Sequence, residues 1–324
     1  MDRGKKPSKI LAAKNSKFYM DSKDTIREHA LAFLPAKSLF RCQGVRRDWM
    51  LQISTPFFAH NQTLSYHGIS GLFYQTHDNP PSFVTTDPKS CGVPDPSLKF
   101  LPVPVDIWSS SNGLLCCQGR TGDKTYYICN PITKRWKNIP KQNANHGSDP
   151  AVVLVFEPSL LNFVAEYKLV CAFPSPDFDG ANEFEIYSSK EGSWKISGEI
   201  CIADRKLIPK TGVHVNGIVY WQSRNGGIVS FDLMKDRSQL IQVYSRPYSL
   251  IGIMDGKLCT AYSSGNFVSV ITLSNVYSNT MQIGSSDETW KDKITFRLDH
   301  ASLGVSQEYM QILYIGNDVV LGHC

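Results

Sequence analysis

The sequence predicts a mainly β protein in which a small helical module is followed by a β-propeller of about six blades. Apolar residues recur at helical spacing only near the N-terminus, whereas from about residue 57 onward short apolar runs alternate with clusters of Gly, Asn, Asp, Pro and Ser. Two similar turn-and-strand segments start 39 residues apart (216 to 255), close to the blade period of about 40–45 residues. We therefore predict a basic tail over 1–23, a helical module over 24–58 and a propeller domain over 59–324.

The basic tail is predicted to be a solvated segment. The chain has a net charge of +5, with 34 Lys and Arg against 29 Asp and Glu, and residues 1–24 contribute +4 of it through seven basic and three acidic residues. A nucleic-acid-binding domain usually concentrates its basic residues on a folded face, so this distribution argues against nucleic acid as a partner. The segment also lacks the apolar stretch of a secretory signal.

Cysteine and histidine usage indicates a reducing compartment and no metal site. The nine cysteines form no C-x-x-C pair, and none of the eight histidines lies at metal-ligand spacing from a cysteine. No apolar run reaches the roughly 18–20 residues that a membrane crossing needs. We therefore expect a protein of the cytoplasm, the nucleus or both, with no cofactor, no metal and no membrane partner.

The helical module is predicted to contain short helices. Pro35 suits the first turn of a helix, and Val45, Trp49 and Ile53 recur every four residues as one apolar stripe. The Ser54-Thr55-Pro56 segment ends that helix, because proline cannot continue the hydrogen-bond ladder. A unit of about 35 residues cannot stabilise itself by burial alone, so the stripe is expected to pack on the propeller or on a partner protein.

The propeller domain is predicted to consist of hairpins. Asn112-Gly113, Asn216-Gly217 and Asp255-Gly256 are dipeptides that favour turns in which both central residues have positive φ. Each is followed by an apolar strand and, after a polar turn, by a second one: LLCC (114–117) and YYIC (126–129), IVYW (218–221) and IVSFDL (228–233), KLCTA (257–261) and FVSVITL (267–273). Cys116 and Cys117 are adjacent in such a strand, so they are expected to face opposite sides.

The sequence contains no recognisable catalytic constellation. It lacks a Gly-rich phosphate loop, H-E-x-x-H and G-x-S-x-G. Asp177, Asp179, Glu183 and Glu185 lie close in sequence, but the segment 174–185 is interpreted as an exposed hairpin loop rather than as the paired carboxylates of a glycosidase cleft. Four tryptophans are interpreted as aromatic packing between blades: Trp136, Trp194, Trp221 and Trp290.

Residues 31–58 resemble an F-box, the helical module with which receptor subunits of Skp1–cullin–F-box ubiquitin ligases hold the adaptor Skp1. The positions that match its pattern of Leu-Pro-x-x-Ser-Leu, Val, Trp, Ile and Pro-x-Phe are Leu34, Pro35, Ser38, Leu39, Val45, Trp49, Ile53, Pro56 and Phe58. Downstream segments are similar to the F-box-associated, kelch-like propeller domain of plant F-box proteins: SSNGLLCC (110–117), YYICNPITKRWKNIP (126–140), FEIYSSKEGSWKISG (184–198), VHVNGIVYWQS (213–223) and VSFDL (229–233).

This resemblance implies a three-helix F-box in a non-catalytic receptor subunit of the ligase. The F-box would bind Skp1 and, through it, a cullin, while the propeller would bind a target protein of unknown identity for ubiquitination. The implied Skp1-binding residues are Ile26, Leu31, Leu34, Pro35, Leu39, Val45, Trp49 and Ile53. Target-binding residues are not assigned, and the candidate loops are those rich in Pro, Asp, Asn and Gly: 75–97, 118–125, 141–150, 174–182 and 222–227.

The chain departs from the family pattern at the start of the F-box. Where the family has acidic-Leu and Glu-Ile-Leu, residues 24–30 read DTIREHA and only Ile26 preserves an apolar contact; Gly44 replaces a helix residue at a cost of about 1 kcal/mol. One alternative is therefore a propeller that binds proteins or glycans beside a degenerate F-box that no longer binds Skp1. A second is an enzyme or lectin of the sialidase or galactose-oxidase kind, against which the missing catalytic constellation counts.

Overall fold

The computed structural model describes residues 30–65, 71–76, 79–85, 92–147, 149–157, 166–202, 206–224, 227–241, 249–264, 267–273, 290–297, 311–315 and 320–323. The chain divides into two compact units, Met1–Gly68 and Ile69–Cys324, and each is described by itself. None of the helices in the described part of the chain combines the length and the apolar character that a membrane crossing needs.

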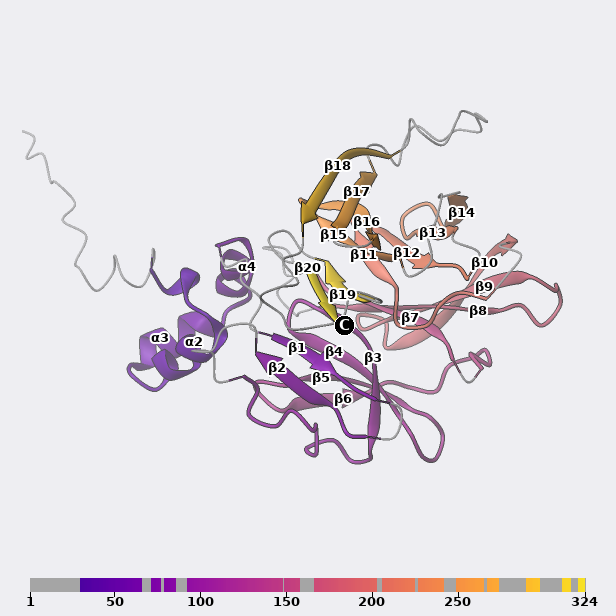
Figure 1. Cartoon of the computed structure of the whole chain (residues 1–324). Helices are drawn as coiled ribbons and strands as arrows, with labels where there is room; N and C mark the ends of the chain where they lie inside the picture. The colour runs from indigo at the N-terminus through magenta and orange to yellow at the C-terminus, as the bar shows by residue number, and fades with distance from the viewer. Residues whose placement is uncertain are drawn as a thin grey trace, which may run out of the picture. The chain divides into compact units, whose positions relative to one another are not determined.

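The first unit contains short helices, drawn in indigo in Figure 1. They are the 3₁₀ helix η2 (Leu31–Phe33) and the α-helices α2 (Ala36–Gln43), α3 (Arg47–Ile53) and α4 (Pro56–Ser65). A small core holds them together: Leu31, Leu39 and Phe58 are buried, and Leu34, Cys42, Trp49 and Ile53 pack against them. The assignment of these helices as a three-helix F-box stays a prediction.

The boundaries of these helices differ from the predicted ones. Val45 precedes α3, whose N-cap is Arg46, so it does not share a helical stripe with the later residues. Gly44 is the C-cap of α2, so the predicted cost of a glycine inside a helix does not apply. Pro56 is the first residue of α4, where a missing N–H has no partner to lose, and the helical structure therefore continues to Ser65 instead of changing to strands at about residue 57.

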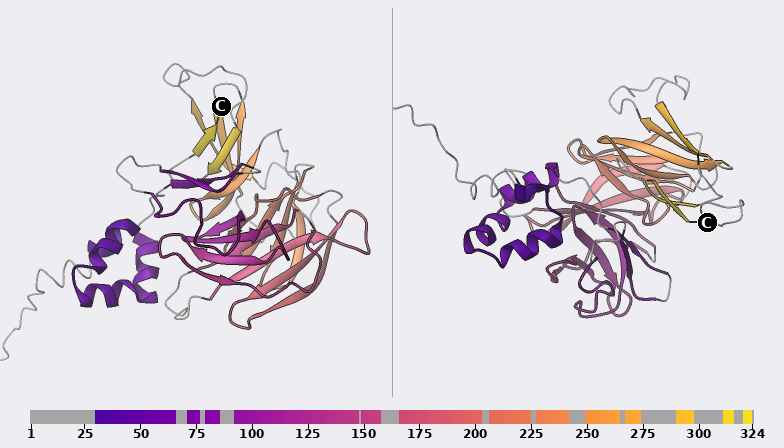
Figure 2. Two further views of the ribbon diagram at one scale, coloured as in Figure 1. Left: turned by 90° about the horizontal axis from the view of Figure 1, so that it is seen from below. Right: turned by 60° about the vertical axis from the view of Figure 1, so that its left-hand side comes forward.

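The second unit is built of antiparallel sheets that follow one another along the chain (Figures 1 and 2). A two-stranded sheet pairs β1 (Gly71–Tyr74) with β2 (Ser82–Thr85). The next sheet has the spatial order β3 (Val105–Ser111), β4 (Leu114–Gly119), β5 (Tyr126–Asn130) and β6 (Arg135–Asn138). It is followed by a sheet of β7 (Ala151–Val155), β8 (Lys168–Pro174), β9 (Ala181–Ser188) and β10 (Ser193–Ile202).

Two further four-stranded sheets repeat this order. One contains β11 (Val213–Val215), β12 (Ile218–Gln222), β13 (Ile228–Asp232) and β14 (Arg237–Ile241). The other contains β15 (Leu250–Met254), β16 (Lys257–Ser264), β17 (Phe267–Leu273) and β18 (Trp290–Arg297). The last described pair is β19 (Gln311–Ile315) with β20 (Val320–His323).

Contacts between the sheets give the unit a propeller-like arrangement. The first strand of one sheet contacts the first strand of the next, in the series β3, β7, β11, β15 and β19. The later strands of each sheet lie progressively farther from this series, as in the blades of a propeller. The mainly β, propeller-like class is therefore confirmed. The number of about six blades stays a prediction, because the described residues contain four sheets of four strands and two of two strands.

The predicted turns are confirmed by the backbone angles. Asn112 and Gly113 have φ of 44° and 81°, Asn216 and Gly217 have 50° and 80°, and Asp255 and Gly256 have 49° and 68°. Both central residues are thus left-handed in each turn, the conformation that Asn, Asp and Gly adopt most readily. These turns join β3 to β4, β11 to β12 and β15 to β16. The first hairpin was therefore recognisable in the sequence for three of the four described four-stranded sheets, and the exception is β7–β8.

The core of the second unit lies between the sheets. One apolar cluster joins β3–β5 to β7–β10 and includes Trp194, and a second joins β7–β9 to β12 and β13 and includes Trp221. Both tryptophans therefore pack between sheets as predicted. The prediction is wrong for Trp136, which is 45% exposed on β6, an edge strand. The side chain of Trp290 lies outside the described ones. Cys116 and Cys117 are both buried in different clusters, as their adjacent strand positions predict.

Candidate partner-binding surface

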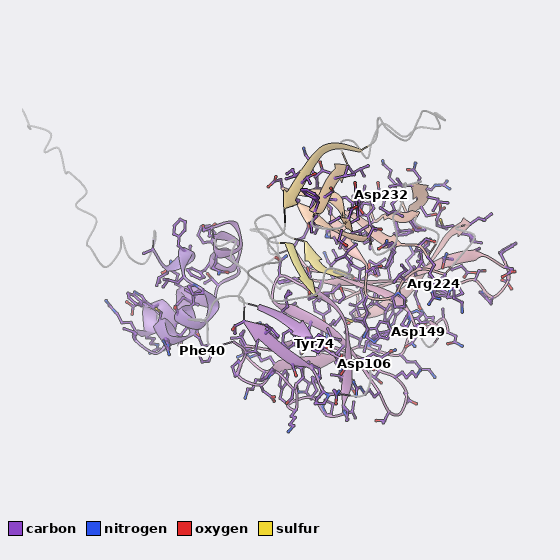
Figure 3. All side chains as sticks on the ribbon, in the orientation of Figure 1. Phe40, Tyr74, Asp106, Asp149, Arg224 and Asp232 are labelled. Carbon is purple, nitrogen blue, oxygen red and sulfur yellow. The ribbon has the colours of Figure 1, made fainter. Side chains whose placement is uncertain are left out.

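Large apolar side chains are exposed on each described helix of the first unit and at Val45, which lies between α2 and α3. Val45 is 65% exposed and Phe40 57%, although both are residues that normally lie in a core. Phe40 belongs to α2 and is labelled in Figure 3. We call the full set of these side chains the exposed apolar set: Phe33, Phe40, Val45, Met50, Leu51 and Phe57. Exposed apolar side chains in this number on so small a unit are typical of a protein-binding surface.

The residues implied by the F-box resemblance occupy different environments. Leu31 and Leu39 are buried in the core of the helical unit. Leu34, Trp49 and Ile53 are partly buried against that core, and Pro35 is of intermediate exposure just before α2. Val45 is exposed, and Ile26 lies outside the described residues. The structure thus brings five of the eight into one packed cluster, in which they hold the helices together.

The exposed apolar set was mostly missed by the sequence reasoning. Trp49 and Ile53 lie on the face of α3 that meets the core, whereas Met50 and Leu51 lie on its other side. A four-residue periodicity identifies one apolar stripe, but α3 carries apolar residues on more than one face. The sequence signal that could have identified these residues is the excess of apolar residues in α3. A helix that is apolar on more than one face needs a second packing partner.

Polar contacts fix the helices that carry this set. Thr55 accepts the backbone N–H of Phe58 on its Oγ1 at 3.2 Å, which caps the start of α4. The side chain of Gln62 on α4 donates to the carbonyl oxygen of Leu34 at 3.4 Å. Arg46 and Asp48 form an exposed ion pair at 2.8 Å at the start of α3. The helical unit therefore holds its exposed side chains on an ordered scaffold.

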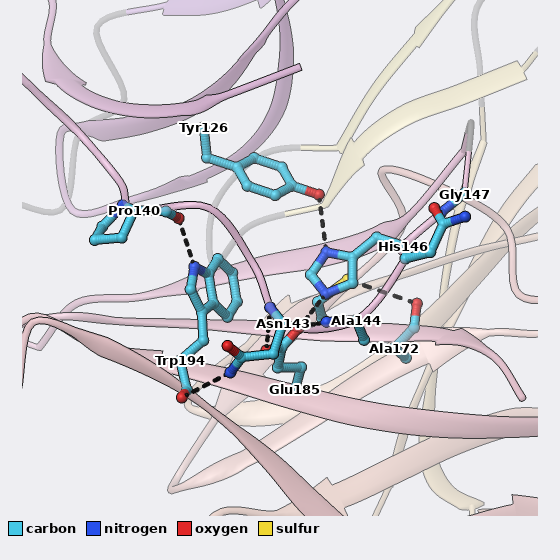
Figure 4. Close-up of polar contacts among 11 residues, drawn as sticks. Tyr126, Pro140, Asn143, Ala144, His146, Gly147, Ala172, Glu185 and Trp194 are labelled. Atoms are coloured by element: carbon cyan, nitrogen blue, oxygen red, sulfur yellow. Dashed lines mark hydrogen bonds and ion pairs between the residues drawn. The ribbon is translucent and has the colours of Figure 1, made fainter. Parts of the chain in front are cut away.

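The propeller unit contains a buried ionisable cluster of its own, shown in Figure 4. His146, in the segment between β6 and β7, lies with its Nε2 2.7 Å from Glu185 Oε2 on β9 and with its Nδ1 3.3 Å from the hydroxyl of Tyr126 on β5. Glu185 also accepts the backbone N–H groups of Asn143 at 2.9 Å and Ala144 at 3.2 Å. Burial alone would raise the pKa of Glu185, but these hydrogen bonds and the nearby imidazole bring it below its ordinary value.

This cluster joins two sheets rather than forming a reaction site. Glu185 and His146 are almost fully buried, so no substrate reaches them. Trp194 donates its Nε1–H to the carbonyl oxygen of Pro140 at 2.8 Å, and Asn143 donates to the carbonyl oxygen of Trp194 at 3.1 Å. These bonds fasten the segment that follows β6 onto the β7–β10 sheet. In the part of the chain that the structure describes, no three His, Cys, Asp or Glu side chains are grouped as a metal site.

The acidic segment 174–185 differs from its prediction as an exposed loop. Asp177 and Asp179 are exposed in the β8–β9 loop, but Glu183 and Glu185 belong to β9. Glu185 is fully buried because both faces of β9 are covered by neighbouring layers. The alternation in EFEIY was the signal for a strand, and a carboxylate in a buried strand requires a partner such as His146.

Four of the five candidate loops for target binding emerge at one face of the second unit. Neighbouring strands in each sheet are antiparallel, so the connection after the second strand emerges at the same end as the connection to the next sheet. Segments 118–125, 174–182 and 222–227 cover the connections after β4, β8 and β12, and 141–150 leads from β6 to β7. The segment 75–97 contains β2 and lies partly outside the described residues.

Sequence comparisons match this chain to F-box proteins. A family model described as "F-box protein At3g26010-like, beta-propeller" matches residues 88–313. F-box protein At5g49610 of Arabidopsis thaliana is 29% identical over 294 residues, which cover 85% of this chain and 79% of that protein. F-box protein At5g07610 of the same plant is 26% identical over 302 residues, 85% of this chain and 70% of that protein. Among solved structures, apo AztD from Citrobacter koseri matches with a TM-score of 0.36 and 11% identity over 73% of this chain and 64% of that one.

Proposed function

Because the chain belongs to the plant F-box family with an At3g26010-like β-propeller, we propose that it is a substrate-receptor subunit of a Skp1–cullin–F-box ubiquitin ligase. The helical unit binds the Skp1 adaptor and, through it, a cullin. The propeller unit binds the target protein. The chain itself performs no chemistry, since holding a target near the ubiquitin-charged subunit is sufficient to accelerate transfer.

The observation that carries this proposal is the exposed apolar set of the helical unit. Fully burying a Leu, Val or Phe side chain contributes roughly 1.5–3 kcal/mol, so a handful of such residues supports a stable complex. We assign the contact with Skp1 to this exposed apolar set, which includes Val45. The packed residues Leu31, Leu39, Trp49 and Ile53 act by holding the helices in place.

The test is the capture of purified Skp1 by the full chain and by matched variants. Val45→Asp and Leu51→Asp place a charge on exposed positions of the helical unit, and we expect both to abolish capture without unfolding the protein. Met234→Asp, on the β13–β14 turn and 88% exposed, is the control and should leave capture unchanged. Trp49→Ala is less informative, because Trp49 packs on the core of the helices.

Failure of the folded, unmodified chain to capture Skp1 would refute the ligase role. The chain would then be a propeller that binds proteins or glycans beside a degenerate F-box. A glycan array would distinguish a glycan-binding propeller from a protein-binding one. A ligase receptor of this kind acts in the cytoplasm, the nucleus or both, and the distribution of a fluorescent fusion in plant cells tests that expectation.

A further inference from the structure

The last strand of the first four-stranded sheet, β6, presents an unpaired edge with a strong positive charge. Among the described strands β6 pairs with β5 alone, and all four of its residues, Arg135–Asn138, are exposed. Residues 124–148 contain five basic residues and no acidic one, a charge of +5, whereas residues 25–324 as a whole carry only +1. The basic residues of this segment are Lys124, Lys134, Arg135, Lys137 and Lys141.

The backbone of β6 is available for pairing on its outer side. The N–H of Ile139 donates to the carbonyl oxygen of Tyr126 at 2.8 Å, and Tyr127 lies opposite Asn138 in the register. Bonded and non-bonded positions alternate along an antiparallel pair, so the backbone groups of Arg135 and Lys137 point towards β5. Those of Trp136 and Asn138 therefore point away from β5, to the side where the described residues contain no further strand.

The side chains of β6 alternate in chemistry as well as in direction. Arg135 and Lys137 lie on one face of the strand, and Trp136 and Asn138 lie on the other. Trp136 is held edge-on to Tyr127, with the ring centroids 5.9 Å apart, and remains half exposed. A strand added beside β6 would thus meet cations at every second position and an indole between them.

The turn that leads into β6 is held in place. The side-chain Oδ1 of Asn130 accepts the backbone N–H groups of Ile132 at 2.9 Å and of Thr133 at 3.0 Å. Lys134 then adopts a left-handed φ of 58°, which directs the chain into β6. The edge is therefore ordered before any partner arrives, which lowers the entropy that binding must overcome.

The other outer strands whose side chains are described do not share this charge. Glu199 on β10 accepts the N–H and the hydroxyl of Ser238 on β14, each at 2.8 Å, and lies 3.4 Å from Arg237. Ser197 on β10 donates to Asp236, just before β14, at 2.7 Å. These edges balance their charges against each other. No ion pair involves Arg135 or Lys137 among the described residues, so the cations of β6 have no such neutralisation.

Charged residues on an edge strand also protect it from pairing with other chains. Protection accounts for one or two lysines. It does not account for an acid-free segment of +5, nor for a half-exposed tryptophan at the centre of the edge. A binding edge accounts for all of these features together.

We propose that the outer edge of β6 binds an acidic, extended peptide segment of a partner protein, which adds to the sheet as a further strand. The backbone groups of Trp136 and Asn138 pair with the peptide backbone. Arg135 and Lys137 pair with carboxylates at alternate peptide positions, and Trp136 packs on the apolar residue between them. Only the identification of this partner as a ubiquitination target rests on the proposed function; the binding itself does not.

The test is fluorescence anisotropy of labelled peptides with the full-length chain. The probe is a peptide of alternating glutamate and valine. We expect it to bind more tightly than an alternating lysine and valine peptide, and more tightly than a peptide with the same glutamates and valines in two separate blocks. Equal affinity for the alternating and block peptides would overturn strand addition, because only the alternating one matches the two faces of β6.

Two variants separate the contributions of charge and backbone. Lys137→Glu should weaken binding about fivefold or more, whereas Lys195→Glu, a matched change beside a tryptophan on edge strand β10, should have no effect. Asn138→Pro removes an outward N–H without removing a β5–β6 hydrogen bond, and should weaken binding about fivefold. Circular dichroism and thermal unfolding verify that each variant is folded.

The remaining outcomes are equally decisive. Equal effects of Lys137→Glu and Lys195→Glu would show general electrostatic attraction and overturn the site. The peptide assignment would be overturned if an oligouridine RNA bound more tightly than the acidic peptide and if Lys137→Glu abolished that RNA binding. Skp1 capture, measured on the same preparations, should be unaffected by Lys137→Glu. If the unmodified chain binds the acidic peptide but does not capture Skp1, the ligase role is refuted and the peptide-binding proposal stands.

Discussion

The neighbouring residues Leu39 and Phe40 on α2 allow the two roles of the helical unit to be measured separately. Leu39 is 6% exposed in the core, whereas Phe40 is 57% exposed. If Skp1 covers the exposed part of Phe40, and full burial of a Phe contributes about 1.5–3 kcal/mol, then Phe40→Ala removes about 0.9–1.7 kcal/mol of binding free energy. The dissociation constant should therefore rise about 4- to 18-fold.

Leu39→Ala should act on folding instead. Removal of a buried Leu side chain typically lowers the free energy of unfolding by about 2–5 kcal/mol, whereas a surface change such as Phe40→Ala stays within about 0.5 kcal/mol. Calorimetric titration with Skp1 gives the affinity of each full-length variant. Hydrogen exchange of the α2–α4 amides reports the stability of the helical unit apart from the propeller.

A clear result would refute this reasoning. If Phe40→Ala binds Skp1 as tightly as the unmodified chain, Phe40 is not covered by the partner. If Leu39→Ala also weakens binding while amide exchange in α2–α4 is unchanged, the partner contacts the packed residues directly. Either outcome would contradict the assignment of the Skp1 contact to the exposed apolar set.

Three further predictions concern the propeller unit. Glu185→Ala should lower the free energy of unfolding by about 3–5 kcal/mol, since it leaves the buried His146 without its carboxylate partner. Denaturant unfolding should show a larger loss for this variant than for the exposed control Asp177→Ala. The folded-state pKa of Glu185 is below its ordinary value. Its ionised carboxylate therefore stabilises the protein fully above the unfolded pKa of about 4.3, and this contribution is lost as the pH falls through the lower folded value. In Glu185→Gln, the free energy of unfolding should fall less steeply as the pH is lowered through this range. Burial raises the pKa of Cys259 to about 12, so iodoacetamide at pH 8 should modify Cys42 before Cys259, and mass spectrometry that finds the reverse order would contradict the packing of β16.

The strand pattern of this protein was predictable where its determinants are local. Asn112-Gly113, Asn216-Gly217 and Asp255-Gly256 specify left-handed turns through their own backbone preferences, and each predicted turn is present. The β7–β10 sheet had no such signal, because β7 ends at Val155 and β8 begins only at Lys168. The interval from 112 to 216 therefore spans two sheets, one of them with the long strands β9 and β10.

What the sequence by itself determined was the mainly β, propeller-like class, the order of helices before sheets, and the first two hairpins in three of the four described four-stranded sheets. These follow from periodicity and from turn residues, which act within a few positions along the chain. Only the tertiary structure decided which apolar residues of the helices are exposed, because α3 is apolar on more than one face and packing selects one of them. It alone decided the pairing of His146 with Glu185 and, among the described residues, the position of β6 as an edge strand, since contacts between distant segments depend on how the sheets pack rather than on local sequence.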